Sequence, residues 1–303
     1  MKKYILTLLA LFMFCLSFSQ DILETDFYKM NNKYDASQHL TREIVQYAPL
    51  RQADVMWSRK IWREIDLRQK INHVFYYPQE EEAETVDRDN LFTLLYNAAT
   101  MNGEVSIRAF ARPEKDDEFK SEMTPTDLIE LIEGKKQIKY LLDSWGEDDS
   151  LDVNGNRIEL EGDFRKGGIT QSDIKKWRLK EQWFFDKQRS VMDVRIIGLC
   201  PIADDRDENG ILTGKDNMLC WFYFPQVRNV LRNALAFNLV KNESENKTFE
   251  DIFMKRMFSS TIVKEANVYD REINQYKIGL DALLEAERIK AEIFNIEHDL
   301  WEY

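Results

Sequence analysis

The segment that decides the fold is Val55-Met-Trp-Ser-Arg-Lys-Ile-Trp-Arg-Glu-Ile-Asp-Leu67. Five of its seven odd-numbered residues are Val, Trp, Ile or Leu, whereas its even-numbered residues are mostly charged. Alternation at period two, in a segment rich in Trp, Ile and Val, is typical of a half-buried strand. A helical alternative places Trp57, Ile61 and Ile65 on one stripe, but two charged residues fall on that stripe as well. We therefore predict a strand whose odd-numbered face is buried.

The even-numbered face of this strand is a candidate interface. Trp62 lies there among charged neighbours, and Trp and Arg are enriched where protein contacts exclude water. We expect Trp62, Glu64 and Arg68 to contact a neighbouring subunit. The alternative is that Trp62 belongs to the core, as most aromatic strand residues do.

The rest of the chain mixes helices and strands without a regular βαβ rhythm, which favours the α+β class with mixed antiparallel strands. We expect an acidic linker over 79–88 and loops with one short hairpin over 143–168. Capping residues and hydrophobic periodicity predict helices over 40–47, 91–99, 124–134, 227–237 and 248–267. Alternating apolar residues predict strands over 105–110, 176–185, 191–202 and 217–224.

The C-terminal segment carries an apolar stripe at steps of four and three residues: Ala282, Ala286, Ile289, Ile293, Ile296 and Leu300. This spacing predicts an amphipathic helix. Such a stripe either covers the core of its own domain or docks on another protein. The sequence leaves both alternatives open.

The N-terminus has the pattern of a cleavable secretory signal peptide. Lys2 and Lys3 precede an apolar run over 4–18, and the small residues Ser17 and Ser19 follow. The run is shorter than the roughly 20 apolar residues that cross a bilayer. We expect cleavage between Ser19 and Gln20, an exported chain over 20–303, and no membrane span.

Composition narrows the function classes. The formal net charge of −12 argues against nucleic-acid partners, and 44% hydrophobic residues suffice for a sizeable core. The three histidines, His39, His73 and His298, are scattered, and no nucleophile elbow, phosphate loop or dinucleotide fingerprint occurs. We expect no enzymatic activity. The rival hypothesis is a secreted carboxylate-dependent hydrolase. Any two carboxylates could flank a glycosidic bond, but among 54 acidic residues such pairs are unavoidable, so their presence carries almost no weight.

One segment, 205–216, resembles a calcium-binding loop. Asp205, Asp207, Asn209 and Asp216 stand at positions 1, 3, 5 and 12, and Gly210 stands at position 6, where the loop turns sharply. The flanks are predicted strands rather than helices, and position 12 is Asp instead of the usual Glu. The segment is thus either a calcium site, as in a calcium-stabilised binding module, or an ordinary polar hairpin turn. No other cofactor is expected.

Cys200 and Cys220 lie symmetrically about Gly210 on the two strands that flank this loop. In an exported protein such a pair is consistent with a disulfide. Two buried free thiols are the alternative, since free cysteine is among the most buried residue types. Both interpretations remain open at the level of sequence.

Two blocks of sequence are similar to the GldN/PorN family. The first is Trp57–Leu67 with Lys70–Asn72 and Tyr76-Tyr-Pro78, and the second is Trp177–Ser190 with Val194–Gly198. The resemblance implies a non-enzymatic structural subunit of the type IX secretion and gliding-motility apparatus. It further implies a periplasmic location at the inner face of the outer membrane. The expected partners are a GldK/PorK-like lipoprotein in a ring, further copies of the chain, and a GldM/PorM-like motor protein.

Overall fold

The computed structural model describes residues 43–79, 88–100, 107–137, 164–166, 168–206, 212–237 and 247–301. The predicted signal peptide, with its cleavage site at Ser19 and Gln20, lies outside these residues, as does most of the predicted linker over 79–88. The predicted loops over 143–168 fall almost entirely outside them as well. The described part of the chain belongs to one compact unit that begins at Glu43.

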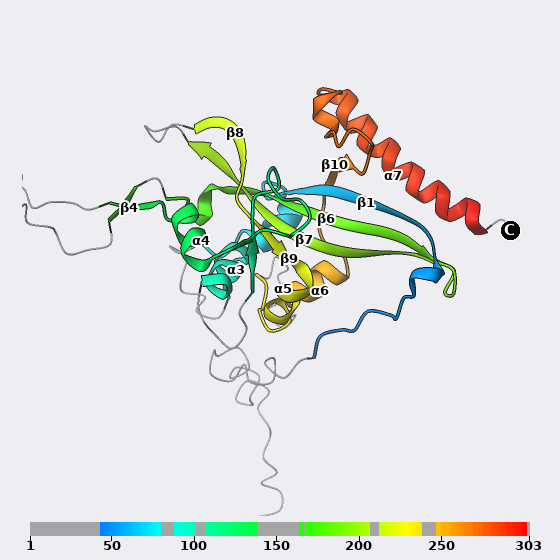
Figure 1. Ribbon diagram of the computed structural model, residues 1–303, viewed down its shortest axis with the longest axis horizontal. Coiled ribbons are helices and arrows are strands. Elements are labelled where there is room, and N and C mark those ends of the chain that lie inside the picture. Colours follow the sequence, from blue (N-terminus) through cyan, green and yellow to red (C-terminus); the bar gives the residue numbers. More distant parts are fainter. Residues whose placement is uncertain are drawn as a thin grey trace, which may run out of the picture. The chain divides into compact units, whose positions relative to one another are not determined.

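An antiparallel sheet organises the described residues (Figure 1). Its eight strands follow the order β10-β1-β6-β7-β9-β2-β3, and β8 also pairs with β7. The strands are β1 (Val55–Asp66), β2 (Ala109–Phe110), β3 (Glu122–Met123), β6 (Ile174–Asp186), β7 (Val191–Arg206), β8 (Leu212–Met218), β9 (Trp221–Tyr223) and β10 (Thr261–Glu265). A separate pair joins β4 (Lys135–Gln137) to β5 (Phe164–Lys166). The predicted α+β class with antiparallel strands is confirmed.

The predicted strand β1 lies between β10 and β6. It pairs with β6 from Val55 to Asp66 but with β10 only from Ile61 to Glu64. Its odd-numbered side chains are buried or half-buried throughout, as the alternation predicts. The even-numbered side chains are exposed from Met56 to Lys60, and beyond that point they become covered too.

In the part of the chain that the structure describes, five α-helices flank the sheet: α3 (Leu91–Thr100), α4 (Pro125–Ile132), α5 (Phe224–Leu231), α6 (Phe249–Met254) and α7 (Leu280–Trp301). The same part contains four short 3-10 turns: η2 (Gln52–Asp54), η3 (Lys70–Phe75), η5 (Gln171–Asp173) and η6 (Ile273–Gln275). Polar residues start the helices as expected. Thr124 forms a capping box with Asp127 at the start of α4, and the Asn90 side chain accepts the backbone N–H of Thr93 at 2.8 Å in α3.

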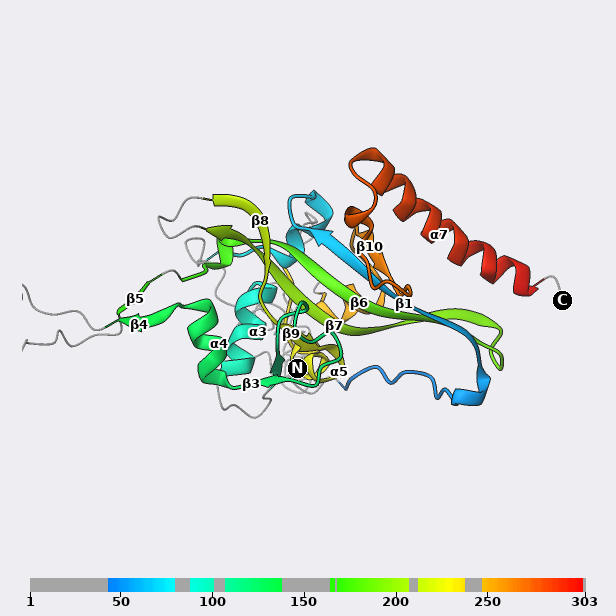
Figure 2. The ribbon, with the colours of Figure 1, turned by 45° about the horizontal axis from the view of Figure 1, so that its top comes forward.

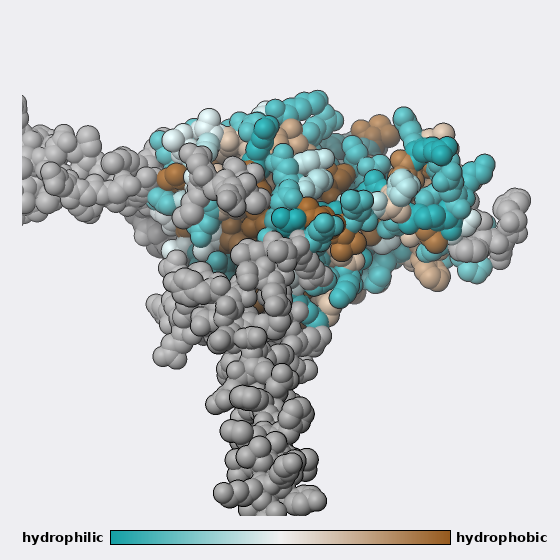
Figure 3. Space-filling view, turned by 90° about the horizontal axis from the view of Figure 1, so that it is seen from below, coloured by the Kyte–Doolittle hydropathy of each residue, from teal (hydrophilic) through white to brown (hydrophobic). Residues whose placement is uncertain are grey.

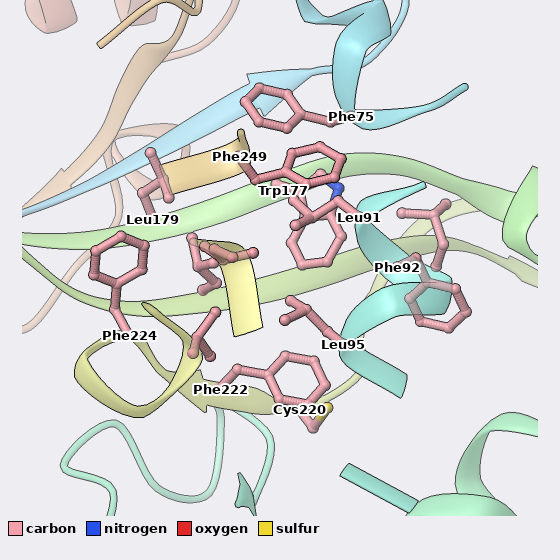
Figure 4. Packing of buried hydrophobic residues seen from close by; sticks show 14 of the residues in the cluster. Phe75, Leu91, Phe92, Leu95, Trp177, Leu179, Cys220, Phe222, Phe224 and Phe249 are labelled. Carbon is pink, nitrogen blue, oxygen red and sulfur yellow. The ribbon is translucent and has the colours of Figure 1, made fainter. Parts of the chain in front are cut away.

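The main hydrophobic core lies between the sheet and helices α3, α5 and α6 (Figure 4). Trp177 and Leu179 of β6 contribute from the strand side, and the α3 residues Leu91 and Leu95 pack toward them (Figure 4). Phe75 stacks on Phe253 with ring centroids 5.1 Å apart. Because these groups are almost fully buried, this cluster supplies most of the apolar burial that stabilises the fold.

A second cluster joins α7 to β1 and β10. It contains the α7 residues Ala286, Ile289 and Ile293 together with Ile61, Ile262 and Ile273. Figures 1 and 2 show α7 running beside this edge of the sheet, apart from α5 and α6. The predicted C-terminal helix is therefore confirmed, and the stripe residues Ala282, Ala286, Ile289 and Ile293 pack in this cluster.

Three of the helix predictions need correction. The segment Glu43–Tyr47 of the predicted helix over 40–47 has no helical turn; Tyr47 instead lies under the Arg228 guanidinium, 4.4 Å from the ring centroid. The helix predicted over 227–237 begins earlier, at Phe224, because the proline that follows fits the first turn, and it ends at Leu231.

The third correction concerns the predicted helix over 248–267. Thr248 caps a helix as expected, but α6 ends at Met254, and Arg256 adopts a left-handed backbone with φ of 52°. The chain then forms strand β10. Its β-branched residues Thr261, Ile262 and Val263 favour an extended backbone, and β1 offers an edge to pair with. Pairing with β1 therefore gives Thr261–Glu265 an extended backbone, although we predicted a helix over the whole of 248–267.

Candidate interaction surfaces

Trp62 is buried by its own chain, in contrast to the exposed position that we expected. Lys264 and Lys180 lie 4.6 Å and 5.1 Å from its ring centroid, and its indole N–H donates to Asp117 at 3.2 Å. It packs in a third cluster with Phe110, Cys200, Trp221 and Val263. Only 5% of Trp62 is exposed, so its ring is not available to a partner in this conformation.

Lys180 is the most deeply placed cation of this cluster. Its ammonium group pairs with the Asp117 carboxylate at 3.0 Å and also donates to the backbone carbonyl of Asp117. Burial lowers the pKa of Lys180, and Asp117 opposes that shift. The segment around Asp117 thus forms a lid over Trp62, held by Asp116, which accepts backbone N–H groups from Glu118, Lys120 and Ser121.

Glu64 belongs to an ion-pair network across β1 and β6. Its carboxylate pairs with Arg178 at 2.5 Å and with Lys176 at 3.7 Å, and Arg178 reaches Glu272 at 2.6 Å. Burial alone would lower the pKa of Arg178, but Glu64 and Glu272 outweigh it, so the pKa is raised. Of the three predicted interface residues, only Arg68 is largely exposed. Its guanidinium group donates to the Asp66 carboxylate at 2.9 Å.

A second buried network lies on the β1–β6 strands at Glu181. This carboxylate is fully buried and pairs with Arg63 at 3.2 Å and with Arg256 at 2.8 Å. It also accepts the Trp183 indole N–H at 3.0 Å. Both guanidinium groups lie over the Trp183 ring, at 5.7 Å and 5.4 Å from its centroid. The network ties β1, β6 and the end of α6 together.

Beside Arg63 and Trp183 a cavity of about 360 Å³ opens along α7. Glu287, Lys290 and Phe294 belong to its helical wall. On the face shown in Figure 3, apolar residues form separate patches among hydrophilic ones. The described residues therefore offer charged and apolar contact areas side by side, which is typical of protein interfaces.

The predicted calcium-loop residues are only partly described. Strands β7 and β8 form a hairpin, with Asp204 opposite Asp216. The strand predicted over 217–224 is divided: its first two residues end β8, Trp221–Tyr223 form β9, and Phe224 starts α5. Asp216 pairs with Lys176 at 2.5 Å, and Asp205 accepts the Thr213 hydroxyl at 3.0 Å. Asp207 and Asn209 lie outside the described residues, so calcium binding stays a prediction. Within the described ranges no group of three or more His, Cys, Asp or Glu side chains is placed to hold a metal ion.

In this structure Cys200 and Cys220 are both buried and not bonded to each other. Cys200 packs in the Trp62 cluster, whereas Cys220 packs in the main core. Burial raises the pKa of the Cys200 thiol to about 12 and raises that of Cys220 as well. Thiols in such surroundings are poor nucleophiles.

Two features escaped the sequence analysis. The Glu181 network joins residues far apart in the chain, and no local pattern marks it. The other is a second apolar stripe on α7, formed by Leu280, Leu284, Ala291 and Phe294, which we call the outer stripe; these residues are exposed. Its spacing of four, seven and three residues was visible in the sequence, but the more regular isoleucine stripe masked it.

The strands, the ion networks and the docked helix together define an α+β protein with extended contact surfaces. Within the described ranges, no helix is long and apolar enough to cross a membrane. The chain belongs to the family of gliding motility associated proteins GldN, which matches residues 50–302. The match includes both sequence blocks on which the resemblance rests, so the predicted family is confirmed. A comparison with curated proteins finds no match.

Proposed function

We propose that this chain is a structural subunit of the gliding-motility and type IX secretion machinery. The observation that carries the proposal is the family match, which extends over residues 50–302 and therefore over nearly the whole described fold. The role needs surfaces that hold neighbours in fixed positions. Long paired strands, with ion networks buried between them, suit a rigid subunit of this kind.

The finer assignments belong to the same proposal. The chain is exported, and its signal peptide is removed between Ser19 and Gln20. The processed chain works in the periplasm, at the inner face of the outer membrane. There it assembles with a GldK/PorK-like lipoprotein and with further copies of itself into a ring, and it contacts a GldM/PorM-like motor protein. The role is non-enzymatic. The cleavage site rests on the N-terminal sequence pattern, and the other assignments rest on the family resemblance.

Co-expression with the lipoprotein tests the proposal. The processed chain and the lipoprotein are produced together and separated by size exclusion, and the large fractions are imaged by negative stain. We expect the two proteins to co-elute as ring-shaped assemblies. Separate elution under conditions in which both proteins are folded contradicts the assembly.

Deletion of the gene in the native cell tests the role in gliding motility and type IX secretion. Removal of the gene is expected to abolish surface gliding and type IX export, and the wild-type gene supplied on a plasmid restores both. Normal gliding and export in the deletion strain contradict the proposed function. N-terminal sequencing of the chain from the native envelope reports whether processing occurs after Ser19.

A further inference from the structure

Helix α7 presents two apolar stripes, and among the described residues only one of them packs against other elements. Ala286, Ile289 and Ile293 pack against β1 and β10. The outer stripe faces away from that contact: Leu280 is 70% exposed, Leu284 58% and Phe294 66%. Most exposed apolar residues of a monomer are scattered singly, whereas exposed apolar residues that gather on one face mark an interaction site.

The outer stripe has the spacing of a helix–helix seam. Leu280, Leu284, Glu287, Ala291 and Phe294 follow one another at steps of four, three, four and three residues. This is the heptad spacing with which two helices pack side chains into each other. The row extends over about four helical turns, or roughly 21 Å. That length suffices for a short two-helix contact.

Further apolar surface lies next to the outer stripe. The cavity of about 360 Å³ lies beside the stripe, between α7 and the strand residues Arg63 and Trp183. At the N-terminal end of α7, Leu283 and Ile278 are exposed as well, the latter by 86%. A helix laid along the outer stripe would therefore also cover apolar surface on the cavity side of the stripe.

The charge in the middle of the seam selects the partner. Glu287 occupies a core position of the heptad and is 71% exposed; its contact is with Lys290 at 3.4 Å. If a second copy of α7 packed in parallel register, or antiparallel about the centre of the stripe, two Glu287 carboxylates would face each other. Like charges in that position are unfavourable. A partner helix with Lys or Arg opposite Glu287 fits instead.

We infer that the outer stripe of α7 docks an amphipathic helix of another protein, which carries a basic residue opposite Glu287 and apolar residues at heptad spacing on either side. The inference rests on α7 alone and goes beyond the proposed function, which does not name a contact surface. In the assembly α7 packs on both sides: Ala286, Ile289 and Ile293 pack against its own sheet, and the outer stripe packs against the partner helix.

Site-specific photo-crosslinking in the native cells tests this inference. The photoreactive amino acid p-benzoylphenylalanine is placed singly at Leu284, Ala291 and Phe294 of the full chain, and the crosslinked peptides are sequenced. We expect all three positions to reach one segment of one other protein. The sites reached from Leu284 and Ala291 are expected to lie about seven residues apart in that segment.

The matched control is Asp299, an exposed residue of the same helix that points about 100° away from the centre of the outer stripe. Photoreactive residues there are expected to give no crosslink to that segment. The variant Glu287→Lys is expected to lower the crosslink yield from Leu284 about tenfold or more, because it opposes like charges. Unchanged thermal melting of the purified variant shows that the loss is local.

Several results would overturn the inference. They are the absence of crosslinks from all stripe positions, adducts with lipid, crosslinks to a second copy of this chain, and crosslinked sites without helical spacing. A yield unaffected by Glu287→Lys would refute the basic partner residue. None of these readouts depends on gliding or export, so the inference and the proposed function fail separately.

Discussion

Replacing Glu181 by glutamine should destabilise the fold more than any comparable change of a surface carboxylate. Glu181 is fully buried, and it is the shared acceptor of Arg63, Arg256 and the Trp183 indole. Glutamine has nearly the same shape but no charge. The change therefore leaves two guanidinium groups close together without the carboxylate that separates them.

The magnitude follows from how well each arginine can reach water. Breaking a buried ion pair by neutralising one partner costs about 3–5 kcal/mol. The Arg63 side chain is only 10% exposed, but that of Arg256 is 27% exposed and can turn toward solvent. We therefore expect the lower end, about 3 kcal/mol. In a fold of this size that loss lowers the melting temperature by roughly 6–12 °C.

Thermal and urea unfolding of the purified chain, followed by circular dichroism, measure this loss. The matched control is Glu122→Gln, which removes a half-exposed carboxylate paired with Arg108 at 3.3 Å. We expect the control to change stability by less than about 0.5 kcal/mol. If Glu181→Gln melts within about 2 °C of the parent chain, the network does not stabilise the fold as argued.

Three further predictions address other parts of the fold. Gly198→Ala places a Cβ 2.4 Å from the Phe119 ring, so the ring must move. We expect the free energy of unfolding to fall by about 1–3 kcal/mol and the near-ultraviolet circular dichroism to change. An unchanged spectrum refutes the close contact. Hydrogen bonds from Arg288 and then Lys277 lower the pKa of Glu285 to about 2 from 4.5, so stability that is present above pH 4.5 should fall as pH drops toward 2. Glu285→Gln should flatten that part of the plot of urea midpoint against pH, and an unaltered plot contradicts the shift. Cys200 and Cys220 should resist alkylation in the native chain and both react in denaturant without a reductant; a mass lower by about two daltons with no labelling indicates a disulfide instead.

The sequence predicted secondary structure correctly where the pattern within a single segment is enough to determine it. The alternation in Val55–Leu67 predicted β1 and its buried face, and Thr124 with Asp127 predicted the start of α4. The same kind of reasoning failed over 248–267, where helical and extended patterns overlap. Thr261–Glu265 is extended because it pairs with the edge of β1, and such an edge exists only once the sheet has formed.

The burial of Trp62 could not be predicted for the same reason. Its strand position and charged neighbours are those of an exposed face, and the residues that cover it come from distant segments. Lys180 belongs to β6 and Asp117 to the segment that Asp116 folds. Each of these residues looks like ordinary surface charge in the sequence. Only their convergence removes the indole from solvent and leaves Arg68 as the largely exposed member of the predicted set.

The C-terminal helix shows how the two sources of information combine. Its sequence contains both the isoleucine stripe and the outer stripe, and periodicity alone does not say which faces the core. Ile289 is fully buried against β1 and β10, so the first stripe is committed to the fold. The second stripe, with Glu287 at its centre, then has no remaining role in the described core. An apolar row that the fold does not use, interrupted by one charge, is better explained by selection for a specific partner than by stability.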